Sequence, residues 1–249
     1  MISFLLAMQF LTVLPLKVKQ FNEKKIAWAL VYFPVVGLFL GLILLGLNIL
    51  LSILGISPEV VNIILVIVLI ILTGGMHLDG LADTADAFLS GKTRKEMLEI
   101  MRDSHIGVMG VLALISTILL KVGLLSSVNF AAKPAALMLM CILSRWSAVL
   151  GMYFFSYARQ EGKAKLFIEG ISLKIFITSA IITIICAFVV MGLEGLIVLL
   201  IISIFTYMAG KFVSKKIGGI TGDTLGATIE LTEVVILLTV CIAQGLIYG

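Results

Sequence analysis

The sequence predicts an all-α, polytopic integral membrane protein, and two properties of its composition indicate this fold class. About 61% of the 249 residues are hydrophobic, or roughly 152, and only 13% are charged. A soluble domain is about half apolar and about a quarter charged. Because one membrane-spanning helix needs ~20 apolar residues, this chain can supply roughly seven. No room remains for a soluble domain, so we expect one membrane domain over residues 1–249.

The elements follow from the order of the apolar runs. Met1–Leu16 is too short to span and its first charge is Lys17, so it lacks the basic start of a signal peptide and predicts an interfacial or re-entrant helix. Seven expected crossings follow, with six or eight as alternatives, and the first is long enough to tilt or to kink at Pro34. The runs are Ile26–Leu54, Val60–Met76, Ile106–Val128, Ala135–Tyr157, Leu173–Gly192, Gly195–Gly210 and Leu231–Tyr248.

Basic residues are concentrated in alternate gaps between these runs. Four such gaps contain 15 of the 18 lysines and arginines, and the opposite gaps contain only Lys133. The positive-inside rule therefore places the four basic gaps in the cytoplasm and, with seven crossings, the C-terminus outside. The long gaps lie on the same side, which predicts catalytic segments at 73–107 and 211–233. The 15 residues are Lys17, Lys19, Lys24, Lys25, Lys92, Arg94, Lys95, Arg102, Arg159, Lys163, Lys165, Lys174, Lys211, Lys215 and Lys216.

Composition also bears on partners. The net charge of +4 is scattered over short loops without a folded basic face, so no nucleic-acid partner is expected. Cys141, Cys186 and Cys241 stand singly in apolar runs, without the spacing of a zinc or redox site, and are interpreted as small buried hydrophobes. Glycine and alanine in the spans permit close helix packing, which favours a homo-oligomer.

An acidic motif begins where the second run ends, at residues 73–88. Asp79, Asp83 and Asp86 are spaced i, i+4 and i+7, so a helix from residue 78 places them on one face. Like charges at this spacing destabilise an isolated helix by roughly 0.2–0.5 kcal/mol per pair, so a cation is expected to compensate them. Mg²⁺ is the candidate, because it binds one or two carboxylates together with substrate phosphates. The alternative is a solvated loop, or pairing with Lys92, Arg94 and Arg102.

The same gap continues through residues 98–110. Arg102 can bind phosphate bidentately, and Asp103 and His105 can bind a metal or move a proton. Each also has a structural alternative, namely an Arg102–Asp103 ion pair and a helix cap by His105. Gly74 and Gly75 permit an unusual turn or a close approach to a ligand.

A second polar segment covers residues 218–233, where Asp223, Glu230 and Glu233 can share one helical face. Acidic residues that enter an apolar run mark an internal or functional site. Lys121 and Arg145 lie inside apolar runs, where each costs ~2.5–3.5 kcal/mol at the bilayer centre. We expect Lys121 to snorkel towards the interface and Arg145 to reach an acidic cluster or an anionic ligand.

Five segments together resemble one known family: GGMHLDGLADTAD (74–86), MRDSHIG (101–107), LSRW (143–146), YARQEG (157–162) and GGxTGDxxGAxxELTE (218–233). They are similar to the cobalamin synthase family, also called adenosylcobinamide-GDP ribazoletransferases. The resemblance runs from the QFLTxLP region (9–15) to residue 233. It implies a bacterial or archaeal enzyme of the cytoplasmic (inner) membrane, with its active site facing the cytoplasm. The implied reaction joins adenosylcobinamide-GDP to α-ribazole, or its 5′-phosphate, with Mg²⁺ as cofactor and GMP as leaving group.

The resemblance leads to a set of assigned roles. Asp79, Asp83 and Asp86 would hold Mg²⁺ against the diphosphate, with Asp103 as a possible fourth ligand. His77 would accept the proton of the attacking ribazole hydroxyl, with Asp223 or Glu230 as alternatives. Together the predicted catalytic residues are His77, Asp79, Asp83 and Arg102, of which Arg102 binds phosphate. The residues assigned to substrate binding are Arg145, Arg159, Asp223 and Glu230.

Two alternative functions belong to other classes. A CDP-alcohol phosphotransferase-like enzyme also carries aspartates at helical spacing, but its motif has Ala-Arg where this chain has Ala82-Asp83. An ion-coupled transporter binds a cation through intramembrane acids, usually near the midplane at broken helices. The acids here gather at one membrane edge, which favours the enzyme.

Overall fold

The computed structural model describes residues 2–15, 23–162 and 164–248 and is all-α, as predicted. The described residues contain no strand, only one isolated bridge between Tyr157 and Ile220. Lys17, Lys19 and Lys163, which the topology prediction used, lie outside the described residues. The elements are α1 (Ile2–Leu11), α2 (Glu23–Ala29), η1 (Leu30–Tyr32), α3 (Phe33–Ile53), α4 (Pro58–Thr73), α5 (Met76–Leu89), α6 (Arg94–Ile100), α7 (Val108–Ser127), α8 (Lys133–Phe154), α9 (Lys165–Gly170), α10 (Leu173–Ile217) and α11 (Gly222–Tyr248).

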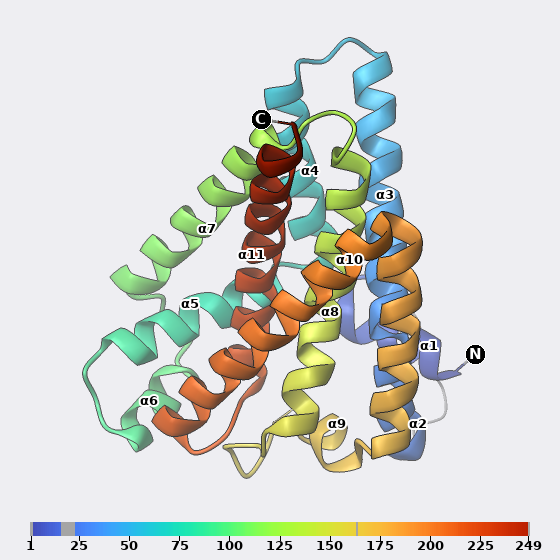
Figure 1. Ribbon diagram of the computed structural model, residues 1–249. Helices are drawn as coiled ribbons and strands as arrows, with labels where there is room; N and C mark the ends of the chain where they lie inside the picture. The colour runs from blue at the N-terminus through green and yellow to red at the C-terminus, as the bar shows by residue number, and fades with distance from the viewer. Residues whose placement is uncertain (1, 16–22, 163, 249) are drawn as a thin grey trace.

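The helices cross the length of the bundle in alternating directions (Figure 1). Five described helices are long and apolar enough to span a membrane, and the bent pair α4–α5 adds a sixth. One of the five, α10, is 45 residues long and has non-helical dihedral angles at Met191 and Gly192. The chain turns back at this point, so α10 forms two arms (Figure 1). With its two arms counted separately, α10 raises the six candidate spans of the described residues to seven, the number expected from the apolar runs.

Two breaks in helical geometry fall at residues that the sequence singles out. Pro34 follows the short 3₁₀ turn η1, and the first pass changes from α2 to α3 there, as predicted. Gly74 and Gly75 both adopt positive φ angles, 65° and 67°, which glycine reaches without steric cost. They produce a 90° bend between α4 and α5. As a result, α5 runs across one end of the bundle instead of continuing through it (Figure 1).

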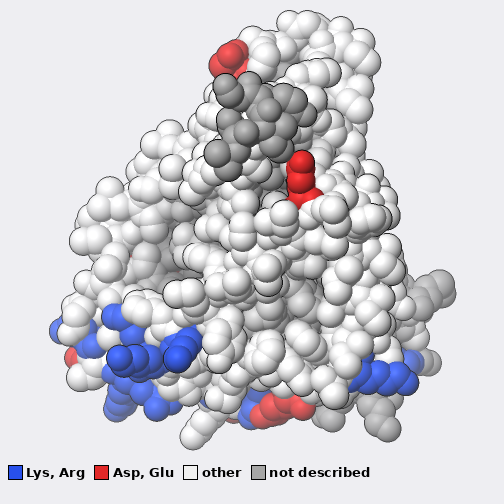
Figure 2. Space-filling model, viewed as in Figure 1, with Lys and Arg blue, Asp and Glu red and all other residues white. Residues whose placement is uncertain are grey.

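Charge is distributed unevenly over the two ends of the molecule. Lysine and arginine gather at the end where α6 and α9 lie, whereas the visible surface above this belt is almost uncharged (Figure 2). The apolar surface includes exposed side chains along α7 and both arms of α10, such as Leu119, Phe188 and Leu200. This pattern is typical of a protein whose sides contact lipid and whose basic end contacts water.

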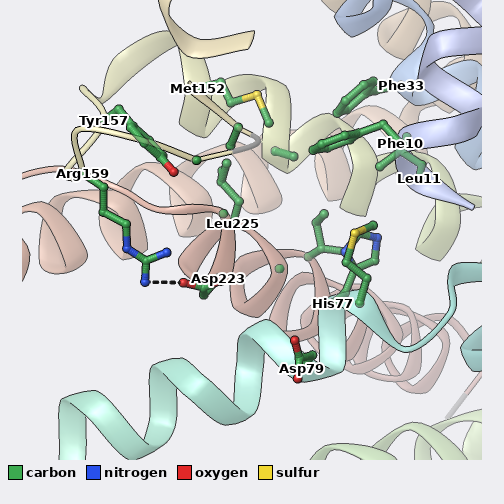
Figure 3. Close-up of a pocket in the computed structure, with 17 residues that line it drawn as sticks. Phe10, Leu11, Phe33, His77, Asp79, Met152, Tyr157, Arg159, Asp223 and Leu225 are labelled. Carbon is green, nitrogen blue, oxygen red and sulfur yellow. Dashed lines mark ion pairs between the residues drawn. The ribbon is translucent and has the colours of Figure 1, made fainter. Parts of the chain in front are cut away.

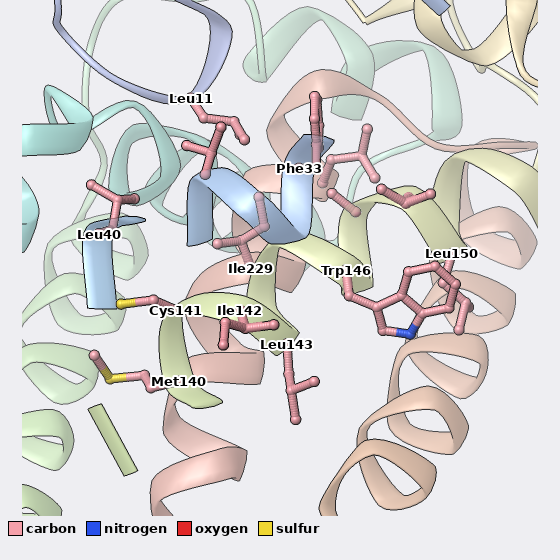
Figure 4. Close-up of a cluster of buried hydrophobic side chains, with 14 of the residues drawn as sticks. Leu11, Phe33, Leu40, Met140, Cys141, Ile142, Leu143, Trp146, Leu150 and Ile229 are labelled. Atoms are coloured by element: carbon pink, nitrogen blue, oxygen red, sulfur yellow. The ribbon is translucent and has the colours of Figure 1, made fainter. Parts of the chain in front are cut away.

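The centre of the bundle is α8, which is buried along most of its length. Figure 4 shows the Cys141 side chain of α8 directed towards the segment of α3 that carries Leu40. A Cβ atom on Gly37 would lie 2.3 Å from the carbonyl oxygen of Cys141, so only glycine permits this approach of α3 to α8. The cysteine prediction is confirmed for Cys141, whereas Cys186 and Cys241 are only half-buried.

The N-terminal helix α1 has 10 residues and a length of about 15 Å, too short to cross a bilayer. It packs against α2 and α3, with Leu6, Ala7 and Leu11 buried. The backbone N–H of Val13 donates to the carbonyl of Leu72, which joins the end of α1 to the end of α4. This contact brings α1 beside the bend where the acidic motif begins.

Candidate functional site

The two polar segments predicted from the sequence meet where α5 crosses the start of α11. A Cβ atom on Gly80 would lie 2.7 Å from the carbonyl oxygen of Asp223, and one on Gly226 would lie 3.2 Å from the backbone of His77. Glycine at these two positions therefore lets the helices touch backbone to backbone. Residues about 145 positions apart in the sequence come together in this way.

A cavity of about 290 Å³ lies beside this crossing (Figure 3). Its polar wall contains His77, Asp79, Arg159 and Asp223, all four of which the sequence predicted as site residues. Its apolar wall comes from α1, α3, α8 and α11. That wall includes Phe10, Leu11, Phe33, Met152 and Ile229.

Arg159 is the cation of the cavity and pairs with Asp223 at 2.6 Å, as the dashed line in Figure 3 marks. The loop that carries Arg159 is held to the turn before α11 by two backbone hydrogen bonds. The N–H of Ala158 donates to the carbonyl of Ile220 at 2.9 Å, and the N–H of Ile220 donates to the carbonyl of Ser156 at 2.8 Å. The guanidinium is therefore fixed on the mouth of the cavity, where it can bind an anion.

Carboxylates outnumber cations near Arg159. Asp79 is exposed on α5 and lies across from Asp223 (Figure 3). Asp83 lies one turn further along α5, the half of the bent pair that runs across the end of the bundle, and its pKa is raised to about 7 by burial and by the charges of Asp79, Asp223 and Asp86. Arg159 opposes this shift only in part. The local charge is thus negative, and an added cation would relieve the repulsion.

Asp86 is occupied by a different partner. Its carboxylate accepts hydrogen bonds from the backbone N–H groups of Gly107 at 2.7 Å and Gly110 at 2.8 Å, at the start of α7. A carboxylate at a helix N-terminus satisfies free N–H groups and interacts favourably with the helix dipole. Asp86 therefore anchors α7 to α5, and its predicted role as a metal ligand stays a prediction.

His77 is buried at the base of the polar wall. Its side chain is 4% exposed, and Nε2 has no hydrogen-bond partner in the described part of the chain. Buried polar atoms are nearly always paired, so a lone nitrogen at a cavity is a candidate ligand contact. No group of three or more His, Cys, Asp or Glu side chains among the described residues is placed to hold a metal by itself.

Comparison with known proteins identifies the family of this chain. The family model for cobalamin-5-phosphate synthase matches residues 3–241. This chain belongs to the cobalamin-5-phosphate synthase family. Similar proteins named adenosylcobinamide-GDP ribazoletransferase include those of Caldanaerobacter subterraneus subsp. tengcongensis (41% identity over 94% of this chain and 95% of the relative), Desulforamulus reducens (34%, 97% and 97%) and Escherichia coli O45:K1 (40%, 84% and 85%). No solved structure matches the chain.

Arg145 and Glu230, which the sequence predicted to bind substrate, do not line the cavity. They belong to a buried network with Lys121 and Glu233. Arg145 Nη1 contacts Glu233 Oε1 at 2.5 Å, Lys121 Nζ contacts Glu230 Oε2 at 2.5 Å, and Lys121 also pairs with Glu233. We name these four residues the buried network. The expectation that Arg145 reaches an acidic cluster is confirmed.

The expectation that Lys121 snorkels is wrong. Its side chain is 4% exposed and points into the bundle, because two carboxylates of α11 offer a closer partner than the membrane surface. Helix α11 begins at Gly222, before the apolar run that starts at Leu231, so Asp223, Glu230 and Glu233 all lie on one helix, as their spacing predicted. Glu230 and Glu233 are buried and Asp223 is half-buried.

The motif at residues 101–107 does not line the cavity. Arg102 and Asp103 are exposed, and Asp103 Oδ1 contacts His105 Nδ1 at 2.6 Å, so the predicted Arg102–Asp103 pair is not the one that forms. The helix cap expected from His105 comes instead from Asp86. Burial raises the pKa of Tyr157 at the cavity mouth, and the charge of Arg102 is among those that oppose this shift. Arg102 thus lies within electrostatic reach of the mouth.

Sequence reasoning did not assign roles to the aromatic residues of the cavity. Phe10, Phe33 and Phe167 form a group in which Phe10 lies 5.8 Å from Phe33 and 4.5 Å from Phe167 between ring centroids. Tyr157 joins the wall beside Arg159. Phe10 and Tyr157 both lie in segments that carry the family resemblance, and this position could have indicated that they belong to the site.

Proposed function

We propose that this chain joins adenosylcobinamide-GDP and α-ribazole, or α-ribazole 5′-phosphate, in the last assembly step of cobalamin synthesis and releases GMP. The observation that carries the proposal is the Arg159–Asp223 pair in one cavity with Asp79 and His77, within a chain of the cobalamin-5-phosphate synthase family. Three of the relatives with similar sequences, which cover most of the chain, bear the name of this activity.

The chemistry is a phosphoryl transfer. A ribazole hydroxyl oxygen attacks the phosphorus that bears the cobinamide, a new P–O bond forms, and the bond to the GMP oxygen breaks. Proteins promote such reactions mainly by positioning the groups and stabilising negative charge. Arg159 binds the phosphate oxygens, and Asp223 holds its guanidinium in place. His77 Nε2, which is buried and unpartnered within the described residues, accepts the hydroxyl proton.

The carboxylates beside Arg159 fit a divalent cation. Asp79 and Asp83 accept no hydrogen bond from the described side chains, and they repel Asp223 across the helix crossing. Mg²⁺ binds through one or two carboxylates and completes its shell with water and substrate phosphate, which suits a site without three protein ligands. When bound, it would stabilise negative charge on the diphosphate. Asp79 and Asp83 are the residues that would hold it.

The cavity is proposed to face the cytoplasm. It lies beside α5, which runs across the end of the bundle where lysine and arginine gather (Figures 1 and 2), and the positive-inside rule assigns such an end to the cytoplasm. The membrane is then the inner membrane of a prokaryotic cell. A homo-oligomer stays a prediction that depends on the small residues in the spans.

A turnover assay tests the proposed function. The purified full-length chain in detergent is supplied with adenosylcobinamide-GDP, α-ribazole and Mg²⁺, and GMP and the cobalamin product are quantified together. We expect both products in equal amounts, only when both substrates and Mg²⁺ are present. GMP release that does not depend on ribazole would indicate a hydrolase, and no turnover with a correctly folded chain would refute the proposal.

A further inference from the structure

A second hollow adjoins the cavity and has a different lining. This groove has a volume of about 540 Å³ and lies between the end of α8, the following loop and α9. It shares Met152, Tyr157 and Arg159 with the cavity. The two spaces therefore meet at Arg159, and we call the second one the α9 groove.

The α9 groove combines aromatic surface with one carboxylate and one ammonium group. Tyr153, Phe154 and Phe155 line it at the end of α8. Lys165 and Glu169 line it from α9, and their charged atoms lie 3.7 Å apart. This is a loose, partly exposed pair, which contributes little and can open at low cost. Lys165 Nζ also donates to the carbonyl oxygen of Gln160 at 2.7 Å, so the carboxylate of Glu169 is the more available of the two charges.

This combination matches the chemistry of guanine. A flat base stacks on aromatic side chains. The N1–H and exocyclic N2–H groups of guanine lie side by side and can both donate to one carboxylate, whereas adenine has neither group on that edge. Glu169 supplies the acceptor, and the ammonium group of Lys165 can donate to O6. A neutral, donor-free ring such as a substituted benzimidazole gains nothing from Glu169.

The position of the α9 groove also suits a leaving group. In phosphoryl transfer the attacking and leaving oxygens lie roughly in line, on opposite sides of the phosphorus. Arg159, which binds phosphate under the proposed function, stands between two hollows. In the first cavity, Asp223 is already paired with Arg159, and the proposed function uses Asp79 for the cation and His77 for the proton, so the rest of the wall is largely apolar. Guanine in that apolar part would lose hydrogen bonds that the α9 groove can supply.

We infer that the α9 groove binds the guanine of the GMP leaving group and that Glu169 is the residue that reads its N1–H and N2–H edge. The inference rests on the proposed function, because it takes the nucleotide from the substrate of that reaction. It goes further by assigning a specificity residue outside the family motifs and outside the first cavity.

Direct binding of GMP tests the inference independently of turnover. Binding of GMP and of IMP, which lacks the exocyclic amine, is measured by isothermal titration calorimetry with the full-length chain in detergent. Hydrogen bonds to a charged group predict that wild type prefers GMP over IMP by about 10-fold or more. Glu169→Gln is expected to weaken GMP binding by about 10- to 100-fold and to remove the preference. Glu169→Asp, which keeps the carboxylate, is expected to retain part of it.

The matched control is Glu99→Gln. Glu99 forms the same i,i+4 pair with Lys95 at 3.9 Å on α6 and does not line the groove, so this variant should bind both nucleotides as wild type does. Equal affinity of wild type for GMP and IMP, or an unchanged preference in Glu169→Gln, would overturn the inference. Normal preference in a chain that shows no ribazole turnover would instead refute the proposed function and leave the nucleotide site standing.

Discussion

The buried network and the charged rim of the cavity are two groups of ionised side chains that share helix α11 but differ in balance. The buried network has two cations and two carboxylates, all nearly inaccessible to solvent. The rim has three carboxylates, Asp79, Asp83 and Asp223, around one cation, Arg159, and opens to a cavity. A balanced and closed group neutralises its own charge, whereas an unbalanced and open group needs charge from a ligand. The difference separates a structural role from a functional one.

The largest expected effect comes from removing one charge of the buried network. Glu233→Gln leaves Lys121 and Arg145 with a single carboxylate in a membrane interior, and breaking a buried pair costs about 3–5 kcal/mol. We expect the free energy of unfolding in detergent to fall by this amount. Glu194→Gln, at an exposed position, should change it by less than about 0.5 kcal/mol. A similar small effect of Glu233→Gln would mean that the network does not stabilise the fold.

At the rim, Asp79→Asn should act on turnover and not on stability. Loss of one group that stabilises the transition state typically lowers kcat by about 100- to 1000-fold. The stability of this variant should stay equal to wild type or rise, because a carboxylate is removed from a repulsive cluster. The Mg²⁺ concentration needed for half-maximal GMP release should also increase. Normal turnover at limiting Mg²⁺ would contradict the assignment of Asp79.

Asp86 tests the boundary between the two roles. If it anchors α7, Asp86→Asn should lower the free energy of unfolding by about 0.5–2 kcal/mol, as loss of a helix-capping acceptor does, and leave the Mg²⁺ requirement unchanged. The measurements are chemical unfolding and GMP release over a range of Mg²⁺ concentrations. An increased Mg²⁺ requirement with unchanged stability would instead identify Asp86 as the metal ligand that its spacing predicted.

The smallest expected effect is a pH dependence at the rim. The pKa of Asp83 is raised to about 7, so the folded protein holds this proton where the unfolded chain has lost it. Stability without Mg²⁺ should therefore fall as pH rises from about 4 to about 7. The part due to Asp83 should be below about 1 kcal/mol, because the group is partly exposed and solvent screens it. This contribution is measured as the difference between wild type and Asp83→Asn in the pH dependence of thermal denaturation. Equal pH profiles of the two proteins would contradict the prediction.

The sequence was informative wherever a membrane restricts the positions or conformations that a residue type can adopt. Apolar runs predicted the passes, Pro34 and the Gly74–Gly75 pair predicted the breaks, and charges inside runs predicted internal sites. It could not predict partners, because these depend on how distant helices cross. From the sequence Lys121 was expected to snorkel, because the position of the two α11 glutamates beside it depends on how α7 and α11 pack.

Asp86 shows the same limit for the acidic motif. It shares a face with Asp79 and Asp83, but only the position of α7 reveals that its carboxylate is used by backbone N–H groups. The aromatic wall is a similar case, because Phe10 reaches the cavity only through the packing of α1 on α3. Spacing along one helix therefore identified the candidates, and contacts between helices divided their roles.

The crossing at Gly80 and Gly226 has a consequence for biosynthesis. One side of the cavity belongs to α5 and the other to α11, so a ribosome must synthesise α11 before the two can touch. Until α11 enters the membrane, Asp79 lacks the opposing Asp223, and Lys121 lacks both of its glutamates. Every intermediate of membrane insertion that lacks α11 therefore also lacks the assembled site. Insertion of α11 both supplies the carboxylates that neutralise Lys121 and completes the cavity.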